Sequence, residues 1–530
     1  MLRRFTPALL FAAASLSAQS TVKLYHDLGT YHKDIGTKVP AAQEYFDQGL
    51  RLVYGFNHAE AIRSFARAAE LDPTCAMCYW GIAYAYGPHV NAGMDSASGV
   101  RAYEAVQKAR ALRARVPAWQ QAYIDAVTAR YAAVPPSARA SLDSAYSRAM
   151  WDASRKYPND LDAAALAAES SMDLRPWNYW TSDLKPYPGT AELVKKLESV
   201  IARNPNHPGA CHFYIHAVEA ANPELAVPCA ERLARLMPGE GHMVHMPAHI
   251  YVRVGRYRDA AMSNVHAIHE DEMFIEGQPQ PTVYSLAYYP HNIHFLAFVS
   301  SMAGRSTQAI DAARTLKSKV NMDAAKNVGM LQEMVPYYVL TLTTFGHWDD
   351  VLAEPLPPAE MRFPTAMARY ARGVAYAAKG DFAKAQVELD SVVAINNAMP
   401  DDAEHKAPTA IAMHALMGEI AARSGKPETA IPHFQEALAI ESKGLYFEPP
   451  KWYYPVRQSL GAALLKAGRN AEAEQVYRDD LKRFPENGWS LYGLAAALRA
   501  QGKTAEAAAV EKRFTKAWAD ADVRLTASRF

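Results

Sequence analysis

A pattern of small, aromatic and proline residues recurs with a period of about 34 residues and limits the possible folds more than any other feature. In FNHAEAIRSFARAAELDP it has the form A-x3-F-x2-A-x4-P, from Ala61 to Pro73. The same spacing recurs from Tyr454, and the next unit starts one period later at Gly488. Further units start near Ala42, Ala76, Pro208, Gly241, Pro290, Gln332, Ala366 and Ile411. Such a period indicates an array of stacked units rather than one compact core.

These units resemble the tetratricopeptide repeat (TPR), a helix-turn-helix unit, at its small and aromatic signature positions. The turn segments GDFAKA, GKPETA, GRNAEA and GKTAEA each place a glycine where a first helix should end. The resemblance covers roughly 42–87 and 192–520 and implies an all-α TPR superhelix, an α-solenoid of about ten units, some of them degenerate. The chain also resembles a group of uncharacterised exported bacterial TPR proteins with HMPxHIY and YYPHN segments.

The pattern divides the chain into five segments. We expect a signal peptide at 1–20, N-terminal TPR units at 21–97, degenerate helical units with an aromatic-rich insertion at 98–190, His-rich TPR units at 191–330 and C-terminal TPR units at 331–530. The first segment, MLRRFTPALLFAAASLSAQS, has arginines, an apolar run and small residues in the order typical of an export signal. We therefore predict a periplasmic or secreted protein.

Charge and hydropathy exclude other classes. The net charge is +1, and lysine and arginine are scattered along the chain, so a nucleic-acid partner is not expected. No segment after the signal has the roughly 18 uninterrupted apolar residues of a transmembrane helix. In an oxidising compartment cysteines tend to pair. Cys211 and Cys229 occupy facing positions of one unit, which predicts a disulfide, whereas Cys75 and Cys78 form a CxxC suited to a structural link or to thiolate ligation.

Histidines gather on three consecutive units. In TPR proteins, positions 2, 5, 9 and 12 of the first helix line the concave groove, and the resemblance places seven histidines at such positions. They are His212, His216, His242, His245, His249, His291 and His294. A chain with 18 histidines in 530 residues does not reach this density by chance. Core histidines with satisfied hydrogen bonds, or a polar groove that binds a peptide, are the two alternatives to a metal site.

Spacings of three and four residues put imidazoles on one helix face, where two can bind one ion and a neighbouring helix can supply more ligands. Imidazole ligands suit a transition metal, here Zn, Cu or Fe, rather than Ca or Mg. Glu219, His266 and His269 are candidates for outer-shell groups. The chain has no H-E-x-x-H motif, no G-x-S-x-G motif and no glycine-rich phosphate loop.

Aromatic residues are the remaining candidates for groove contacts. Trp80 and Tyr84 fall on groove positions of an N-terminal unit, and Trp177 and Trp180 lie in the insertion RPWNYWTSDLKPYPG. Two functions fit these features. The first is an exported TPR module that holds a metal and a peptide, protein or small ligand in its groove. The second is a metal-dependent hydrolase or oxidase with the histidines as its active site.

Overall fold

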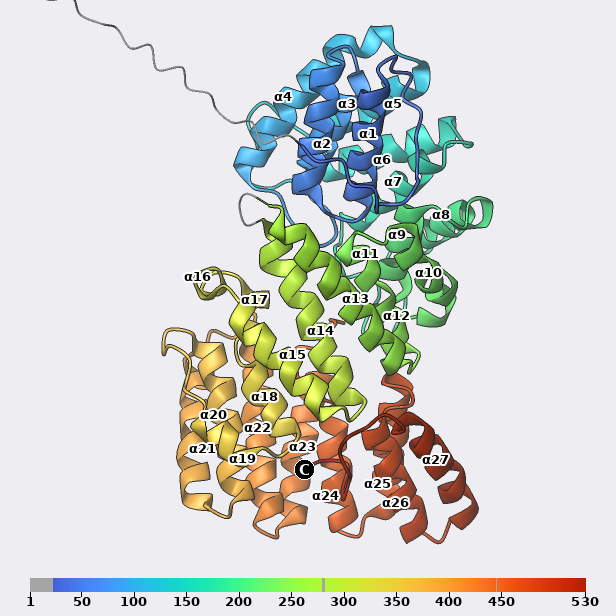
Figure 1. The fold of residues 1–530 in the computed structure, drawn as a ribbon. Helices are drawn as coiled ribbons and strands as arrows, with labels where there is room; N and C mark the ends of the chain where they lie inside the picture. The colour runs from blue at the N-terminus through green and yellow to red at the C-terminus, as the bar shows by residue number, and fades with distance from the viewer. Residues whose placement is uncertain (1–21, 279–281, 445) are drawn as a thin grey trace, which may run out of the picture.

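A computed structural model of the chain describes residues 22–278, 282–444 and 446–530 (Figure 1). The predicted signal peptide at 1–20 lies outside the described residues. Within the described part the regular secondary structure is helical, and the only β-type pairings are two isolated bridges. The predicted all-α fold class is confirmed. No helix in this part is both long and apolar enough to cross a membrane.

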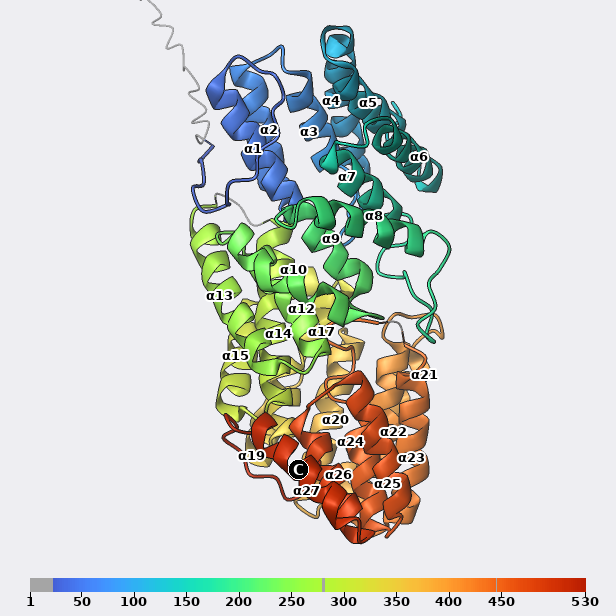
Figure 2. The ribbon, with the colours of Figure 1, turned by 90° about the vertical axis from the view of Figure 1, so that its right-hand side faces the viewer.

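The N-terminal helices occupy one end of the molecule (Figures 1 and 2). They are α1 (Pro40–Tyr54), α2 (His58–Leu71), α3 (Ala76–Ala85), α4 (Ser96–Leu112), the 3-10 turn η1 (Arg113–Arg115), α5 (Ala118–Ala129), α6 (Ala140–Lys156), α7 (Leu161–Met172) and α8 (Thr190–Arg203).

The middle helices carry the predicted histidines. They are α9 (Pro208–Val218), α10 (Pro223–Leu236), α11 (Gly241–His245), α12 (Pro247–Arg253), α13 (Tyr257–Glu276), the π-helix η2 (Tyr284–Tyr288), α14 (Tyr289–Met302) and α15 (Ser306–Lys319).

The C-terminal helices form the opposite end (Figure 1). They are α16 (Met322–Ala325), α17 (Gly329–Met334), α18 (Tyr337–Thr344), α19 (Trp348–Ala353), α20 (Arg362–Ala378), α21 (Phe382–Ala398), α22 (Lys406–Arg423), α23 (Pro427–Glu441), α24 (Val456–Lys466), α25 (Asn470–Arg483), α26 (Gly488–Ala500) and α27 (Thr504–Ala517).

Small and aromatic signature residues allow these helices to stack closely. The Phe65 ring of α2 lies where a Cβ on Gly49 or on Gly81 would sit, at 2.6 and 2.5 Å. One aromatic ring therefore fills the space that two glycines leave, one in its own unit and one in the next. Tyr477 fits between Gly461 and Gly493 in the same way, with ring atoms 2.3 and 2.2 Å from the two Cβ positions. The small and aromatic residues of the sequence pattern therefore recur because each aromatic ring packs against glycines of two adjacent helices.

Most turns inside the units share one hydrogen-bonding pattern. In these, though not between α9 and α10, a backbone N–H donates to the carbonyl five residues earlier, as from Arg256 to Tyr251 at 2.7 Å and from Asp381 to Tyr376 at 2.9 Å. The preceding residue has a positive φ and is a glycine, for example Gly255 at 78° and Gly380 at 80°. Glycine occupies this position because a side chain is strained in the left-handed region.

The first unit departs from this rule. Asn57 donates the same bond to Leu52, at 2.9 Å, but the residue with positive φ is Phe56, at 59°. A bulky side chain in this conformation costs about 1–2 kcal/mol. The strain places the Phe56 ring, which is 3% exposed, against the histidines of α9 and α11.

The solenoid closes on itself, because the C-terminal units contact the ends of the middle units (Figures 1 and 2). The Trp489 indole of α26 donates to the Ser301 carbonyl at 3.0 Å. The Asp522 carboxylate accepts the backbone N–H groups of Ser306 and Thr307, at 2.6 and 2.9 Å, and so caps α15. These contacts fix the C-terminal units against the turn between α14 and α15.

Candidate metal site

Three consecutive first helices carry the predicted histidines. α9 carries His212 and His216, and α14 carries His291 and His294. Between them, the segment with His242, His245 and His249 is divided into α11 and α12, because Pro247 begins a new helix and cannot donate the backbone bond that would continue α11.

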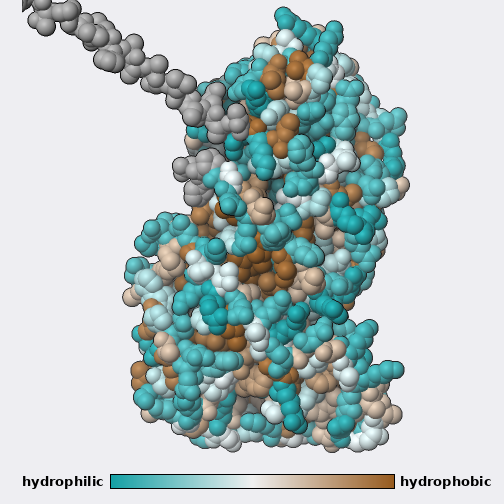
Figure 3. Space-filling model, in the orientation of Figure 1, coloured by the Kyte–Doolittle hydropathy of each residue, from teal (hydrophilic) through white to brown (hydrophobic). Residues whose placement is uncertain are grey.

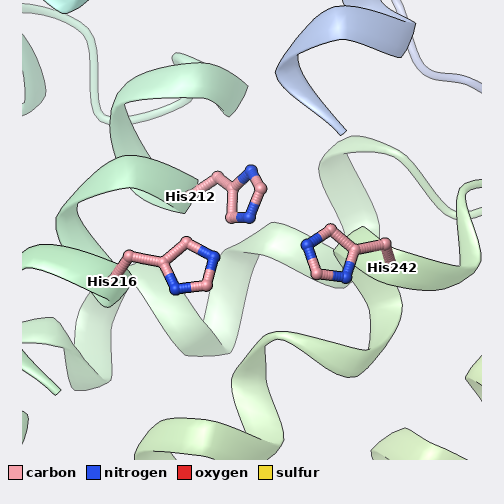
Figure 4. Close-up of side chains that lie close together, drawn as sticks. All are labelled: His212, His216 and His242. Carbon is pink, nitrogen blue, oxygen red and sulfur yellow. The ribbon is translucent and has the colours of Figure 1, made fainter. Parts of the chain in front are cut away.

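Six of the seven histidines form two triads. His212, His216 and His242 make the first triad (Figure 4), and His245, His249 and His291 make the second. Within each triad, one nitrogen from every ring lies within 4.8 Å of the others. The triads adjoin, since the ring centroids of His216 and His249 are 6.0 Å apart, as are those of His242 and His245.

The seventh histidine lies outside both triads. His294 is one helical turn from His291, but its ring packs edge-on against Tyr337 with a centroid distance of 4.1 Å. The prediction that His294 belongs to the metal set is therefore not matched by the structure. At the next turn of α14 the side chain follows the helix face away from His291 and towards α18.

Glu219 connects the two triads. Its carboxylate oxygens lie 3.1 Å from Nδ1 of His216 and 2.7 Å from Nδ1 of His249. Burial would raise the pKa of Glu219, but attraction to His249 and hydrogen bonds from both imidazoles outweigh it and lower the pKa to about 2. An ionised carboxylate only accepts hydrogen bonds, so an Nδ1 atom bonded to it carries a proton, and an imidazole that stays neutral in this orientation keeps the lone pair of its Nε2 atom.

His212 and His245 are held in the same tautomer. His212 Nδ1 donates to the Tyr54 carbonyl at 2.6 Å. His245 Nδ1 lies 2.8 Å from Oδ1 of Asn264, whose Nδ2 donates to the Ala260 carbonyl. The Asn264 oxygen must therefore accept from His245. This arrangement, with Nδ1 bonded to an acceptor and Nε2 left bare, is the one found for histidines that ligate metals.

The bare nitrogens converge in the second triad. His245 Nε2 lies 2.9 Å from Nε2 of His249 and 3.2 Å from Nε2 of His291. When both imidazoles are neutral and protonated on Nδ1, their Nε2 lone pairs repel unless a cation lies between them; a proton on Nε2 of His249 would instead make a hydrogen bond to His245. Imidazoles on one tetrahedral ion have nitrogens about 3.3 Å apart. The convergence of three nitrogens fits a shared metal ion, while the 2.9 Å distance between His245 and His249 also fits a hydrogen bond.

The first triad leaves its nitrogens without partners. Nε2 of His212, Nε2 of His216 and both ring nitrogens of His242 are buried and make no hydrogen bond. Unsatisfied buried nitrogens are costly. The alternative that these are core histidines with satisfied hydrogen bonds is therefore not supported.

Burial favours the uncharged form of five triad imidazoles, those of His212, His216, His242, His245 and His291. Burial, together with the neighbouring histidines, lowers the pKa of His212, His242, His245 and His291 well below the ordinary value. Burial also lowers the pKa of His216, although Glu219 acts in the opposite direction. Neutral imidazole is the form that binds metals.

Aromatic side chains close the cluster. The Phe56 ring lies 4.5 Å from His212, and Trp177 lies 4.9 Å from His216, centroid to centroid. Trp177, like Phe56, has a positive φ, of 63°. Two strained aromatic residues at one cluster are typical of a functional site. Tyr288, from the segment before α14, completes the enclosure at 4.5 Å from His242.

The groove is thus filled rather than open at this position. All members of the triads except His291 are at most 3% exposed. The surface over α14 and α15 shows hydrophobic residues at the middle of the face in Figure 3, with hydrophilic residues around them. An extended peptide does not fit against the histidines without displacing Phe56 and Trp177.

Several predicted residues take other places. Trp80 and Tyr84 are not groove residues, because their rings stack at 5.4 Å and are buried in the core beside Tyr123. His266 and His269 are exposed on the outer face of α13 and do not reach the triads. Of the three outer-shell candidates, the structure places only Glu219 there.

The cysteines are paired differently from the expectation. Cys75 and Cys78 form a disulfide, which matches the structural link predicted for the CxxC. Cys211 and Cys229 are both free, with their sulfurs 2.9 Å apart as in hydrogen-bonded thiols. The predicted proximity is present, but the sulfurs are farther apart than the roughly 2.05 Å of a disulfide.

Two further histidines adjoin the first triad. His89 stacks on Phe56 at 4.5 Å, and His58 lies 4.4 Å from His89, centroid to centroid. Sequence reasoning missed both, because they lie outside the groove positions of the repeat. Their signal in the sequence is weak, because it consists of single histidines, one in GPHVN and one two residues after Phe56.

A third group, Glu333, Glu404 and His405, also has ligand atoms close together. There the Lys451 ammonium lies 3.0 Å from a carboxylate oxygen of Glu333 and 3.0 Å from one of Glu404. A lysine thus provides the positive charge that a metal would supply. This group is an ion-pair network.

The architecture defines the class of protein as an all-helical repeat solenoid with an enclosed histidine cluster. The tetratricopeptide repeat model matches residues 366–391 and 488–510. The match shows tetratricopeptide repeats in these two C-terminal segments, and the other helix pairs and turns of the chain repeat the same architecture. No curated protein matches it.

Solved structures resemble the chain only distantly. A structure titled human IFIT1 dimer with m7Gppp-AAAA has 15% identity and a TM-score of 0.34, with 92% of each chain covered. Yeast Tom70 has 13% identity and a TM-score of 0.29, with 91% of this chain and 92% of that chain covered. The Cut9 and Hcn1 complex of the APC/C has 12% identity and a TM-score of 0.28, with 89% and 96% covered. What these proteins bind is not transferred to this chain.

Proposed function

We propose that this chain is an exported TPR protein that binds transition-metal ions in its two histidine triads and presents them to a small ligand. The observation that carries the proposal is the convergence of six buried or half-buried imidazoles in two triads, four of which have an acceptor facing Nδ1 so that Nε2 points into the triad. His212, His216 and His242 would hold one ion, and His245, His249 and His291 another. Zn, Cu or Fe suits this donor set.

The aromatic rings around the histidine triads limit the size of the ligand that can reach a bound metal. Because Phe56 and Trp177 cover the first triad, a small molecule fits the site better than a peptide or a protein. Those larger partners have the outer TPR surfaces available to them. Export remains part of the proposal through the amino-terminal sequence pattern at 1–20.

A second candidate function is a metal-dependent hydrolase or oxidase. It is favoured by the number of ligands, since structural zinc sites have four protein ligands, whereas catalytic sites have three and keep a position open. A bound metal would supply Lewis acidity or, for a redox metal, electron transfer. The chain itself would orient the ligands through Glu219 and Asn264 and exclude water with its aromatic residues.

Metal analysis of the protein from the exported fraction tests the proposal. We expect stoichiometric metal, loss of about one ion in His245→Ala and in His242→Ala, and no loss in His269→Ala, which removes an exposed histidine. Metal-free protein that takes up none of the three metals would contradict the metal site. A native protein with Met1 retained would contradict export.

A further inference from the structure

A second cavity lies beside the histidine cluster and has a different chemistry. Its volume is about 400 Å³, and it is enclosed by the aromatic insertion, the end of α12 and the C-terminal units. The lining residues used below are Trp177, Trp180, Arg253, Tyr446, Arg457 and Arg483. Trp177 and Trp180, which the sequence singled out as candidate groove contacts, both line this cavity, whereas the arginines were not recognised.

Three arginines bring unpaired donors to the cavity. The Arg457 and Arg483 guanidinium groups make no hydrogen bond or ion pair with other described residues. Arg253 donates to the carbonyls of Arg483 and Ala220, at 2.9 and 3.4 Å, but its Nε is buried without a partner. A buried cationic donor without an acceptor is costly, and a bound anion would satisfy it.

Acidic neighbours do not neutralise this charge. Asp479 at the edge is paired with Lys482 at 2.7 Å. Glu441 and Glu448 lie behind the arginines, and burial raises the pKa of each to about 7, although the arginines lower it. Burial therefore disfavours the charged form of both carboxyls, and it also raises the pKa of Asp480, which lies near Arg457 and Arg483. Among the residues that line the cavity, four cations (Arg253, Arg457, Lys482 and Arg483) face one carboxylate, Asp479.

The apolar walls are planar and fixed in place. The Trp180 indole donates to the Ala217 carbonyl at 2.8 Å, which holds its ring. Arg253 lies over the Tyr446 ring at 5.5 Å. Trp177 and Tyr446 also form the wall shared with the histidine cluster, since Trp177 packs on His216 and the Tyr446 hydroxyl lies 3.4 Å from Glu219.

We propose that this cavity binds a small carboxylate with a planar apolar body, next to the histidine triads. A guanidinium group offers two parallel N–H donors that match a carboxylate, and the indole rings offer faces for stacking. Arg253 lies one helical turn beyond His249 on α12, so one helix contributes to both sites. The inference goes beyond the proposed metal function and does not require a metal to be bound.

Calorimetry with benzoate, using benzamide as the uncharged analogue and inorganic phosphate as a second anion, tests this assignment on the full-length mature protein. We expect benzoate to bind at least tenfold more tightly than benzamide, and Arg457→Gln to weaken benzoate binding about tenfold or more. Arg101→Gln, an exposed arginine on α4, makes the same charge change and should have no effect.

Three results would overturn the assignment: equal binding of benzoate and benzamide, benzoate affinity unchanged in Arg457→Gln, or binding of phosphate without benzoate. Arg483→Gln provides a second variant, and circular dichroism of each variant shows whether it folds. The titrations are run on metal-free and metal-loaded protein. Benzoate binding to protein that takes up no metal would support this cavity while contradicting the metal site.

Discussion

At the scale of single residues, Glu219 has the clearest expected effect, because it orients one histidine in each triad. In Glu219→Gln, the amide can accept from only one imidazole, and its NH2 group faces the N–H of the other. We expect metal affinity to fall 10–100-fold, as for other outer-shell substitutions. Titration of the metal-free variant with Zn²⁺ measures this loss.

The matched control for this substitution is Glu198→Gln. Glu198 is exposed and accepts a hydrogen bond from Tyr214, away from the triads. It should bind metal as the unmodified protein does. If both variants bind equally well, Glu219 has no role in orienting the histidines.

Two substitutions at Phe56 separate the energetic cost of its left-handed backbone conformation from the stability that its ring contributes. Phe56→Ala removes the ring and keeps the strain, whereas Phe56→Gly removes both. We expect the glycine variant to be less destabilised than the alanine variant by about 1 kcal/mol. Phe213, buried in the helix α9, should show the opposite order, since glycine is worse than alanine there by about 1 kcal/mol. Denaturant unfolding monitored at α1–α9 gives both differences.

At the scale of helices and turns, the repeat was predictable from sequence because its cause is local. Glycines at the turns and small residues under Phe65 and Tyr477 are needed in every unit, so they leave a period. The histidines of α9, α11, α12 and α14 could be located because the period assigns each of them a position within its unit. The exception in the first turn, where Phe56 replaces glycine, breaks the period and was not recognised.

What covers each helix was not predictable, because it depends on segments far apart in the chain. The groove position of Trp80 and Tyr84 is buried by Tyr123 of α5. The triads are enclosed by Phe56 and Trp177, which lie in different units. A repeat register specifies which face a side chain occupies, and long-range packing decides whether that face is open.

Cys211 lies on α9 and Cys229 on α10, and the contact between their thiols leads to a prediction about these two helices. The sulfurs are 2.9 Å apart, with Cys229 donating to Cys211, and this bond, together with the charge of Arg232, lowers the pKa of Cys211 despite burial. We expect oxidation to close a disulfide, which stabilises the chain by about 3 kcal/mol for a loop of this size. Peptide mapping without reductant detects it. In Cys229→Ser, adding reductant should then leave the stability of α9 and α10 unchanged.

At the scale of the whole molecule, closure of the solenoid connects the histidine site to the C-terminal units. Trp489 and Asp522 attach the last units to α14 and α15. Arg253 of α12 donates to the Arg483 carbonyl of α25. Repeat arrays contact mainly their neighbours, so such long-range contacts are what fix the C-terminal units against the middle units.

Metal binding should therefore stabilise the middle of the molecule as one body. An ion in the first triad joins α9 to α11, and an ion in the second joins α12 to α14. Binding to the folded state alone adds about 2.7 kcal/mol per site when free metal is 100 times the dissociation constant. We expect chelator to lower the unfolding temperature and metal to restore it, with slower hydrogen exchange in α9–α14 and little change in α20–α23. The double variant His242→Ala, His245→Ala should lose this response, while His266→Ala, His269→Ala should keep it. An unfolding temperature that ignores both chelator and every metal offered would mean that the lone pairs of the two triads are satisfied in some other way.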